Sequence, residues 1–158
     1  MNLNIMLIDD NKIDLFVNQK IIELLAINSK VTTFDSGTSA IDFFKILEGQ
    51  SNFKSVLFPD IILLDINMPE MDGFQFLSEF KKLKGFKNKH TRIYILSSST
   101  NIEDVKKAKK KKSCIGFISK PLTTESLKKI LPNCKPYLHE YDYLEEGADI
   151  IKNIPNSN

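Results

Sequence analysis

The chain has 158 residues, a length typical of one domain with little room for a second. Hydrophobic residues make up 42% and charged residues 27%, the composition of an ordinary soluble protein with a packed core. The formal net charge of +2 is too small to indicate a polyanionic partner, and no apolar run approaches the roughly 20 residues that cross a bilayer.

The N-terminal segment lacks the basic region of a signal peptide and enters a strand-like apolar run at once. The two cysteines, Cys114 and Cys134, form neither a C-x-x-C pair nor a cluster of metal ligands. We therefore expect a cytoplasmic protein whose thiols are reduced and serve as small buried hydrophobic groups.

Five short apolar runs predict strands at residues 5–8, 31–34, 61–64, 93–96 and 115–118. All but the second run are continuously apolar rather than alternating. This pattern is typical of strands that are buried on both faces of a parallel sheet.

Apolar residues at helical spacing separate these runs. The first apolar stripe comprises Ile13, Phe16, Val17, Ile21, Leu24 and Leu25. The others comprise Ala40, Phe43, Phe44 and Leu47; Phe74, Leu77 and Phe80 with Phe76 or Leu83; Ile102, Val105 and Ala108; and Leu127, Ile130 and Leu131. Residues 36–38 and 123–125 are helix start signals, and Pro132 should end or kink the last helix.

The alternation predicts an α/β fold of the (βα)₅ type, a doubly wound parallel sheet of five strands with helices on both faces. We expect this domain to span residues 1–132. The segment 133–158 would then be a C-terminal tail, with no separate output domain. The connection 48–59 is longer than usual and could carry a short extra turn.

Polar residues stand where four of the predicted strands end. Asp9 and Asp10 follow the first, Asp65 the third, Ser97 the fourth and Lys120 the fifth. The carboxyl ends of parallel strands share one edge, where ligands bind at the point of strand-order reversal. In the flavodoxin-like order 2-1-3-4-5, that point lies between the two strands that precede the aspartates.

Three carboxylates at this edge would repel, at roughly 3 kcal/mol for each pair about 5 Å apart in an effective dielectric near 20. Partial protonation or a bound cation must offset this repulsion. Oxygen ligands favour Mg²⁺, with Mn²⁺ as an alternative. A metal ion beside a carboxylate nucleophile indicates phosphoryl transfer, with Lys120 as a second cation and Ser97 as a hydrogen-bond donor.

Four segments also carry a resemblance to a known family: Ile8-Asp9-Asp10, Leu64-Asp65-Ile66-Asn67-Met68-Pro69-Glu70-Met71-Asp72-Gly73, Leu96-Ser97-Ser98 and Ser119-Lys120-Pro121. Their order and spacing resemble those of the receiver domain of bacterial response regulators, over about residues 3–131. Each segment alone is a weak signal, whereas the four together are highly specific.

The resemblance implies a role for each matching residue. Asp65 would be the phosphoacceptor. Asp10 and Asp65 would bind Mg²⁺, with Asp9 acting directly or through water and Asn67 contributing its backbone carbonyl. Four further positions have implied roles: Ser97 and Lys120 would contact the phosphoryl group, Phe117 would be the aromatic switch, and the peptide bond before Pro121 would be cis.

Each motif also has a structural explanation. Asp9 and Asp10 could form a turn and a helix cap, and we assign Asp72 and Gly73 to helix entry. The lysines of segment 106–112 suit a solvated helix end better than a nucleic-acid surface, because no aromatic residues or recognition motif accompany them; a docking surface for an acidic partner is a third interpretation. We expect His90 and His139 on the surface.

We expect a switch that is not an enzyme in the turnover sense. A sensor histidine kinase or a histidine phosphotransfer protein would supply the phosphoryl group, and the output would pass to a downstream protein rather than to DNA. The protein would be a monomer or a phosphorylation-dependent homodimer. Two alternatives remain: an aspartyl phosphohydrolase, which usually needs an acid where Asn67 stands, and a receiver-shaped binding module that does not switch.

Overall fold

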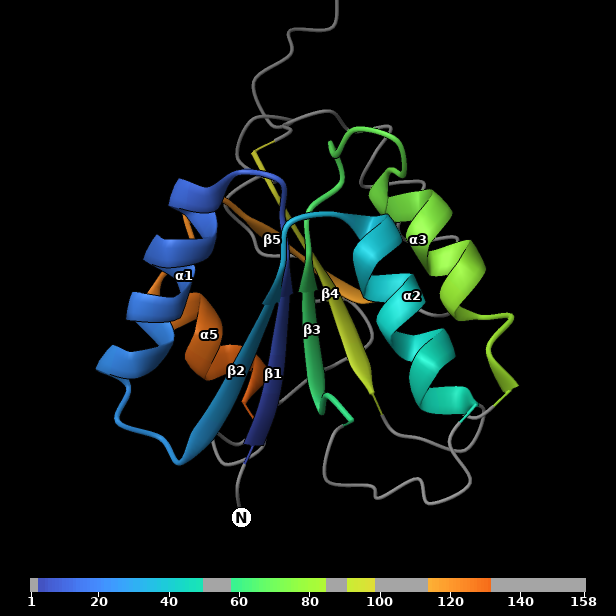
Figure 1. Cartoon of the computed structure of the whole chain (residues 1–158). Helices are drawn as coiled ribbons and strands as arrows, with labels where there is room; N and C mark the ends of the chain where they lie inside the picture. The colour runs from blue at the N-terminus through green and yellow to red at the C-terminus, as the bar shows by residue number, and fades with distance from the viewer. Residues whose placement is uncertain (1–2, 50–57, 85–90, 99–113, 132–158) are drawn as a thin grey trace, which may run out of the picture.

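The computed structural model describes residues 3–49, 58–84, 91–98 and 114–131. Five parallel strands form one sheet in the order β2-β1-β3-β4-β5, as predicted. Each strand extends or matches a predicted apolar run (Figure 1). The strands are β1 (Leu3–Ile8), β2 (Ser29–Phe34), β3 (Ile61–Leu64), β4 (Arg92–Ser97) and β5 (Cys114–Ser119).

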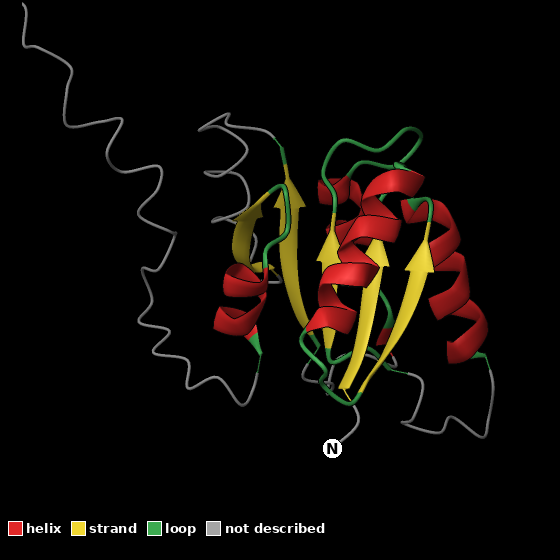
Figure 2. Ribbon diagram, turned by 90° about the vertical axis from the view of Figure 1, so that its left-hand side faces the viewer, coloured by secondary structure: helices red, strands yellow, loops and turns green. Residues whose placement is uncertain are grey.

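Helices cover both faces of the sheet, which gives three layers (Figures 1 and 2). On one face lie α1 (Lys12–Leu24) and α5 (Thr124–Ile130), and on the other lie α2 (Gly37–Glu48) and α3 (Gly73–Phe80). Within these ranges no helix has the length and apolar character needed to cross a membrane.

Several predicted features lie outside the described residues. These are the fourth helix with Ile102, Val105 and Ala108, most of the connection 48–59, the lysine-rich segment 106–112, His90, His139, Cys134 and the tail 133–158.

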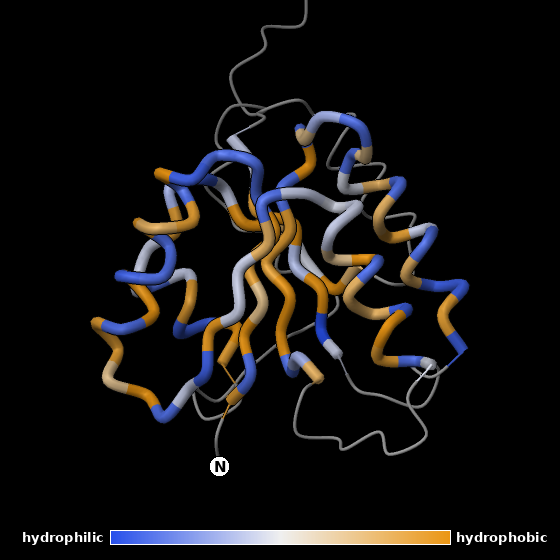
Figure 3. The backbone as a smooth tube through the Cα atoms, viewed as in Figure 1, coloured by the Kyte–Doolittle hydropathy of each residue, from blue (hydrophilic) through white to orange (hydrophobic). Residues whose placement is uncertain are grey.

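The central strands are apolar on both faces, and each face has its own core cluster. Met6 and Ile8 of β1 pack with residues of α2 and α3, whereas Ile5 and Leu7 pack with residues of α1 and α5. The central strands β1, β3 and β4 are accordingly hydrophobic along most of their length (Figure 3). Continuous apolar runs therefore mark strands buried on both faces, as the sequence predicted.

The helix starts follow local capping chemistry. Ser36 caps α2 by accepting a hydrogen bond from the Ser39 amide, and Thr123 forms a capping box with Ser126 at the start of α5. Both starts were predicted. Helix α5 ends at Ile130, and Leu131 is extended, as expected for a residue that precedes proline.

The apolar stripe predicted for α1 is buried only in part, because Ile21 and Leu25 pack against the core whereas its other members are exposed. Ile13 and Leu24 are each 72% exposed and Phe16 is 62% exposed, whereas Leu15 and Ile22 are buried together with Asn18. Apolar residues occur around most of this helix, so their spacing alone does not select a face. The packing of α1 against the sheet and α5 selects Leu15 and Ile22, and it leaves several large apolar side chains of this helix exposed.

This assignment can be checked by protein stability. Ile22→Val removes one methylene from a buried side chain and should lower the free energy of unfolding by about 1 kcal/mol. Leu24→Ala removes more atoms from an exposed side chain, yet it should change the stability by less than about 0.5 kcal/mol. Urea unfolding of both variants tests this, and the opposite ranking would mean that Leu24 rather than Ile22 faces the core.

The run 115–118 is also less buried than predicted. The β4–β5 register shifts between Ile93 and Tyr94, which pair with Cys114 and Gly116, so that Ile115 is left unpaired and 48% exposed. This is a β-bulge in an edge strand. Burial raises the pKa of the Cys114 thiol, which fits the structural role expected for this residue.

Candidate functional site

Three aspartates meet at the carboxyl edge of the sheet. Asp9 and Asp10 follow β1 and Asp65 follows β3, and these two strands are neighbours. The Asp65 backbone amide donates a hydrogen bond to the Ile8 carbonyl at 2.8 Å, which extends the hydrogen-bond ladder between β1 and β3 into the site. Each aspartate offers an oxygen within 4.8 Å of those of the other two, and Asp9 and Asp65 are buried whereas Asp10 is exposed.

The Lys120 ammonium lies among these carboxylates. Its Nζ is 2.7 Å from Asp9 Oδ2 and 3.0 Å from Asp65 Oδ1. Its backbone amide donates to the Ser97 carbonyl at 2.9 Å, and its peptide bond with Pro121 is cis. The packing of β5 beside β4 thus brings together Lys120 and the aspartates, which are far apart in the sequence.

Two effects offset the repulsion among the carboxylates. Burial raises the pKa of Asp9, although the contact with Lys120 and the Asn11 amide act in the opposite direction. Burial alone would lower the pKa of Lys120, but its contacts with the carboxylates of Asp14, Asp9 and Asp65 prevail and raise it. Lys120 therefore stays charged and serves as a permanent counter-ion.

The raised pKa of Asp9 makes stability depend on pH. The folded protein holds this proton more tightly than the unfolded chain does. Asp9 therefore contributes stability below 3.8, the ordinary pKa of an aspartate, and this contribution is lost as the pH rises through the folded pKa. Without divalent metal, Asp9→Asn should be more stable than the wild type at pH 7, by about 1 kcal/mol.

Urea unfolding at pH 7 and near pH 4 measures this difference, which should shrink at the lower pH. Asp42→Asn on the exposed face of α2 is the control and should show no such change. A less stable Asp9→Asn protein at pH 7 would mean that the ion pair with Lys120 outweighs the cost of burying the carboxylate.

The loop after β3 aligns the Asp65 side chain. The Asn67 amide donates to Asp65 Oδ2 at 2.7 Å, while the Asn67 side chain is exposed. Asp72 caps α3 through a capping box with Gln75, as expected for a helix entry. The Gly73 amide donates to the Ile66 carbonyl at 2.9 Å, so this loop returns close to the backbone of Asp65.

Ser97 and Phe117 lie on the two strands farthest from β2. Ser97 ends β4 and is fully buried, and it pairs in register with Ser119 of β5. Phe117 is half-buried in β5 and packs against the core cluster that includes α2 and α3. The structure therefore places Ser97 beside the strand that leads to Lys120.

The sequence interpretation missed Asp14. This residue lies in the first turn of α1, and its Oδ2 accepts a hydrogen bond from Lys120 Nζ at 2.8 Å. Asn11 caps the helix and accepts from the Asp14 amide, so an acidic residue there suits a helix start. Because this local role explains an acidic residue at the position, the sequence gives no sign of the contact with Lys120, which is 106 residues away.

Comparison with known proteins gives one consistent result. The family model of the response regulator receiver domain matches residues 5–132. The probable methanogenesis regulatory protein FilR2 of Methanothrix harundinacea is 26% identical over 133 residues, which cover 84% of this chain and 81% of that protein.

Two solved structures are similar as well. The chain is 31% identical to a two-component response regulator from Cytophaga hutchinsonii, with a TM-score of 0.69 over 82% of this chain and 92% of the other. It is 26% identical to the phosphorylated cyanobacterial phytochrome response regulator RcpA, with a TM-score of 0.63 over 80% of this chain and 86% of the other.

Proposed function

Because the chain belongs to the response regulator receiver domain family of two-component signalling, we propose that Asp65 accepts a phosphoryl group from a phosphohistidine. This proposal rests on the position of Asp65. Its carboxylate is buried beside two further aspartates, and one of its oxygens lies 3.0 Å from a lysine ammonium. The similar cyanobacterial regulator is described as phosphorylated, which supports the same chemistry here.

In the proposed reaction, an Asp65 carboxylate oxygen attacks the phosphorus atom. The bond between phosphorus and the donor's imidazole nitrogen breaks, and its electron pair remains on that nitrogen. Lys120 would neutralise charge on the phosphoryl oxygens, because its ammonium already contacts Asp65 Oδ1. The Asn67 amide would hold the carboxylate in orientation through Asp65 Oδ2.

The donor set fits Mg²⁺, or Mn²⁺ in its place. Asp9 Oδ2 is buried and, apart from its ion pair with Lys120, has no hydrogen-bond partner among the described residues, so it can still accept a ligand. Asp9, Asp10, Asp65 and the backbone carbonyl of Asn67 would hold the ion through oxygen atoms. When bound, Mg²⁺ would neutralise phosphoryl oxygens during transfer.

Phosphorylation would act as a switch through Ser97, Lys120 and Phe117. The new group adds a charge of about −1.5 to −2 at Asp65. Ser97 and Lys120 would move toward this group. Phe117, which is half-buried, would turn inward and change a surface that binds a downstream protein. Couplings of this kind typically amount to about 1–3 kcal/mol.

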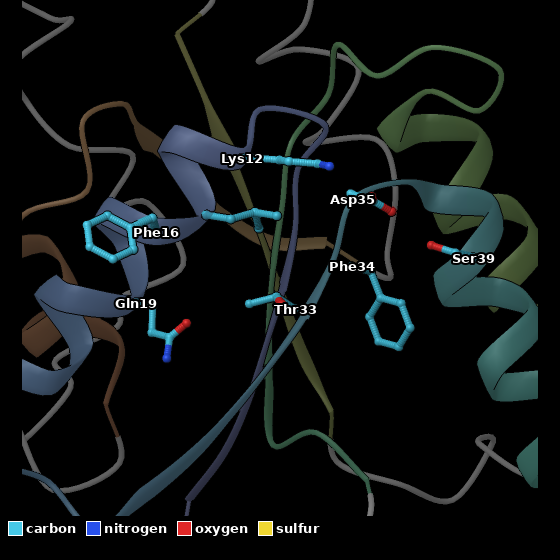
Figure 4. Close-up of a pocket in the computed structure, with 8 residues that line it drawn as sticks. Lys12, Phe16, Gln19, Thr33, Phe34, Asp35 and Ser39 are labelled. Atoms are coloured by element: carbon cyan, nitrogen blue, oxygen red, sulfur yellow. The ribbon is translucent and has the colours of Figure 1, made fainter.

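Helix α1 offers a contact surface for the proposed phosphodonor, a sensor histidine kinase or a histidine phosphotransfer protein. Ile13 and Phe16 are exposed on this helix, whose first turn reaches the site through Asp14. Beside Phe16 lies an open hollow of about 490 Å³ between α1 and the end of β2, also lined by Lys12 and Asp35 (Figure 4). Exposed apolar patches of this kind mark protein contacts.

Incubation with acetyl phosphate tests the proposal without a partner protein. In Mg²⁺ the intact mass should increase by one phosphoryl group per chain, and chelation of the metal should prevent the gain. Phe16→Ser should react like the wild type, because a small donor does not need the α1 surface. If the mass stays unchanged in Mg²⁺ and beryllofluoride, a mimic of the acyl phosphate, also fails to bind, the proposal is wrong.

A further inference from the structure

The contact between Asp14 and Lys120 has no part in the proposed phosphoryl transfer. Asp14 is not one of the three aspartates that converge as possible metal ligands. Its carboxylate nevertheless accepts a hydrogen bond from Lys120 Nζ at 2.8 Å, a distance between those from Lys120 to Asp9 (2.7 Å) and to Asp65 (3.0 Å). The unphosphorylated protein thus shares one ammonium among three carboxylates.

The surroundings of this ion pair make it stronger than an ordinary surface pair. The Lys120 side chain is 14% exposed and that of Asp14 is 34% exposed, whereas both partners of the Lys20–Glu23 pair on the same helix are about half exposed. Reduced solvent screening strengthens a pair of charges. Asp14 also belongs to a helix, and the Asn11 cap restricts how its backbone can move.

We propose that Asp14 is a positioning residue that holds the Lys120 ammonium in the unphosphorylated protein and competes with the phosphoryl group for it. This inference rests on the proposed function of Asp65. When the oxygen–phosphorus bond forms and the donor's bond to phosphorus breaks, Lys120 gains a partner with more charge than a carboxylate. Asp14 stabilises the state before transfer and so lowers the affinity of the site for a phosphoryl group.

The test compares the wild type with Asp14→Asn, which keeps the side-chain size and removes the charge. With Mg²⁺ present, the affinity for beryllofluoride should rise about fivefold in the variant, a value at the lower end of typical coupling between sites. Fluorine NMR of the bound group measures this affinity. Loss of a purely structural contact would weaken binding rather than strengthen it.

A second measurement observes Lys120 directly and needs no phosphoryl analogue. In the metal-free wild type, the Lys120 ammonium protons should exchange slowly with water, because the group is paired and largely buried. In Asp14→Asn they should exchange faster, as seen by nitrogen-15 NMR of the lysine side chains. Asp14→Glu retains the carboxylate and should return both measurements toward the wild-type values.

Glu23→Gln is the matched control, because it removes one negative charge from the same helix. Glu23 is nine residues beyond Asp14, about 14 Å along the axis at 1.5 Å per residue, which exceeds the screening length of about 8 Å in physiological salt. This variant should match the wild type in both measurements.

The outcomes separate the two proposals. If the wild type binds beryllofluoride and Asp14→Asn binds it equally or less tightly, the inference about Asp14 is wrong and the proposed function stands. If ammonium exchange is unchanged in Asp14→Asn, Asp14 does not hold Lys120, which also overturns the inference. If the wild type neither binds beryllofluoride nor gains mass from acetyl phosphate, the proposed function itself fails.

Discussion

The Asp65→Asn variant is expected to gain no phosphoryl group from acetyl phosphate in Mg²⁺, whereas the wild type gains one. An amide is a poor nucleophile compared with a carboxylate, and it carries no charge to bind a cation. The variant should remain folded, because it removes one of three mutually repelling carboxylates and leaves Lys120 paired with Asp9 and Asp14. Intact mass spectrometry measures the gain, and thermal unfolding checks the fold.

Asp42→Asn is the control for this experiment. It makes the same chemical change at an exposed position of α2, where the carboxylate contacts only Lys45 among the described residues. This variant should be phosphorylated like the wild type. If Asp65→Asn still gained one phosphoryl group, the nucleophile would have to be a neighbouring carboxylate, and Asp9 and Asp10 would be the next variants to test.

Gly73→Ala is expected to lower the free energy of unfolding by about 3 kcal/mol, the upper part of the range for overpacking. A Cβ atom at Gly73 would lie 2.5 Å from the Asp65 carbonyl oxygen and 3.0 Å from the Ile66 Cα. Both contacts are with backbone, so no side-chain rotation relieves them. The loop that follows the phosphoacceptor must shift instead, and the rate of reaction with acetyl phosphate should fall together with the stability.

Gly49→Ala provides the comparison for this effect. Gly49 is at the C-terminal cap of α2, where an added Cβ meets only carbonyl oxygens at 3.7 Å and beyond. The stability should change by less than about 1 kcal/mol. Urea unfolding of the two variants in parallel measures the difference. Equal stabilities would show that the α3 start can move away from Asp65 without cost.

Much of the fold follows from local patterns in the sequence. The strands around residues 5–8, 61–64 and 93–96 were identified by continuous apolar runs, and the structure places all three at the centre of the sheet. Such runs are typical of these strands because a strand covered on both faces needs apolar residues at every position. The caps at Ser36 and Thr123 were equally visible, since each involves residues only three positions apart.

The sequence did not predict in the same way which face of α1 is buried. Ile13, Phe16 and Leu24 satisfy helical spacing as well as Leu15 and Ile22 do, but only the second pair is buried. When a helix is apolar on several sides, its orientation depends on where the sheet and the neighbouring helix lie. The β-bulge at Ile115 has the same origin, because pairing with β4 decides which residue is left out.

The sequence by itself determined the α/β architecture and the residues that stand at the strand ends, because strand periodicity and motif spacing are local properties. It also identified Asp9, Asp10 and Asp65 as a group, since the carboxyl ends of parallel strands share one edge of the sheet, and the structure brings these carboxylates together. Only the tertiary structure decided that Lys120 is shared with Asp14, at 2.8 Å across 106 residues of sequence. Contacts between side chains of distant elements depend on how helices pack on the sheet, and no local pattern records that packing.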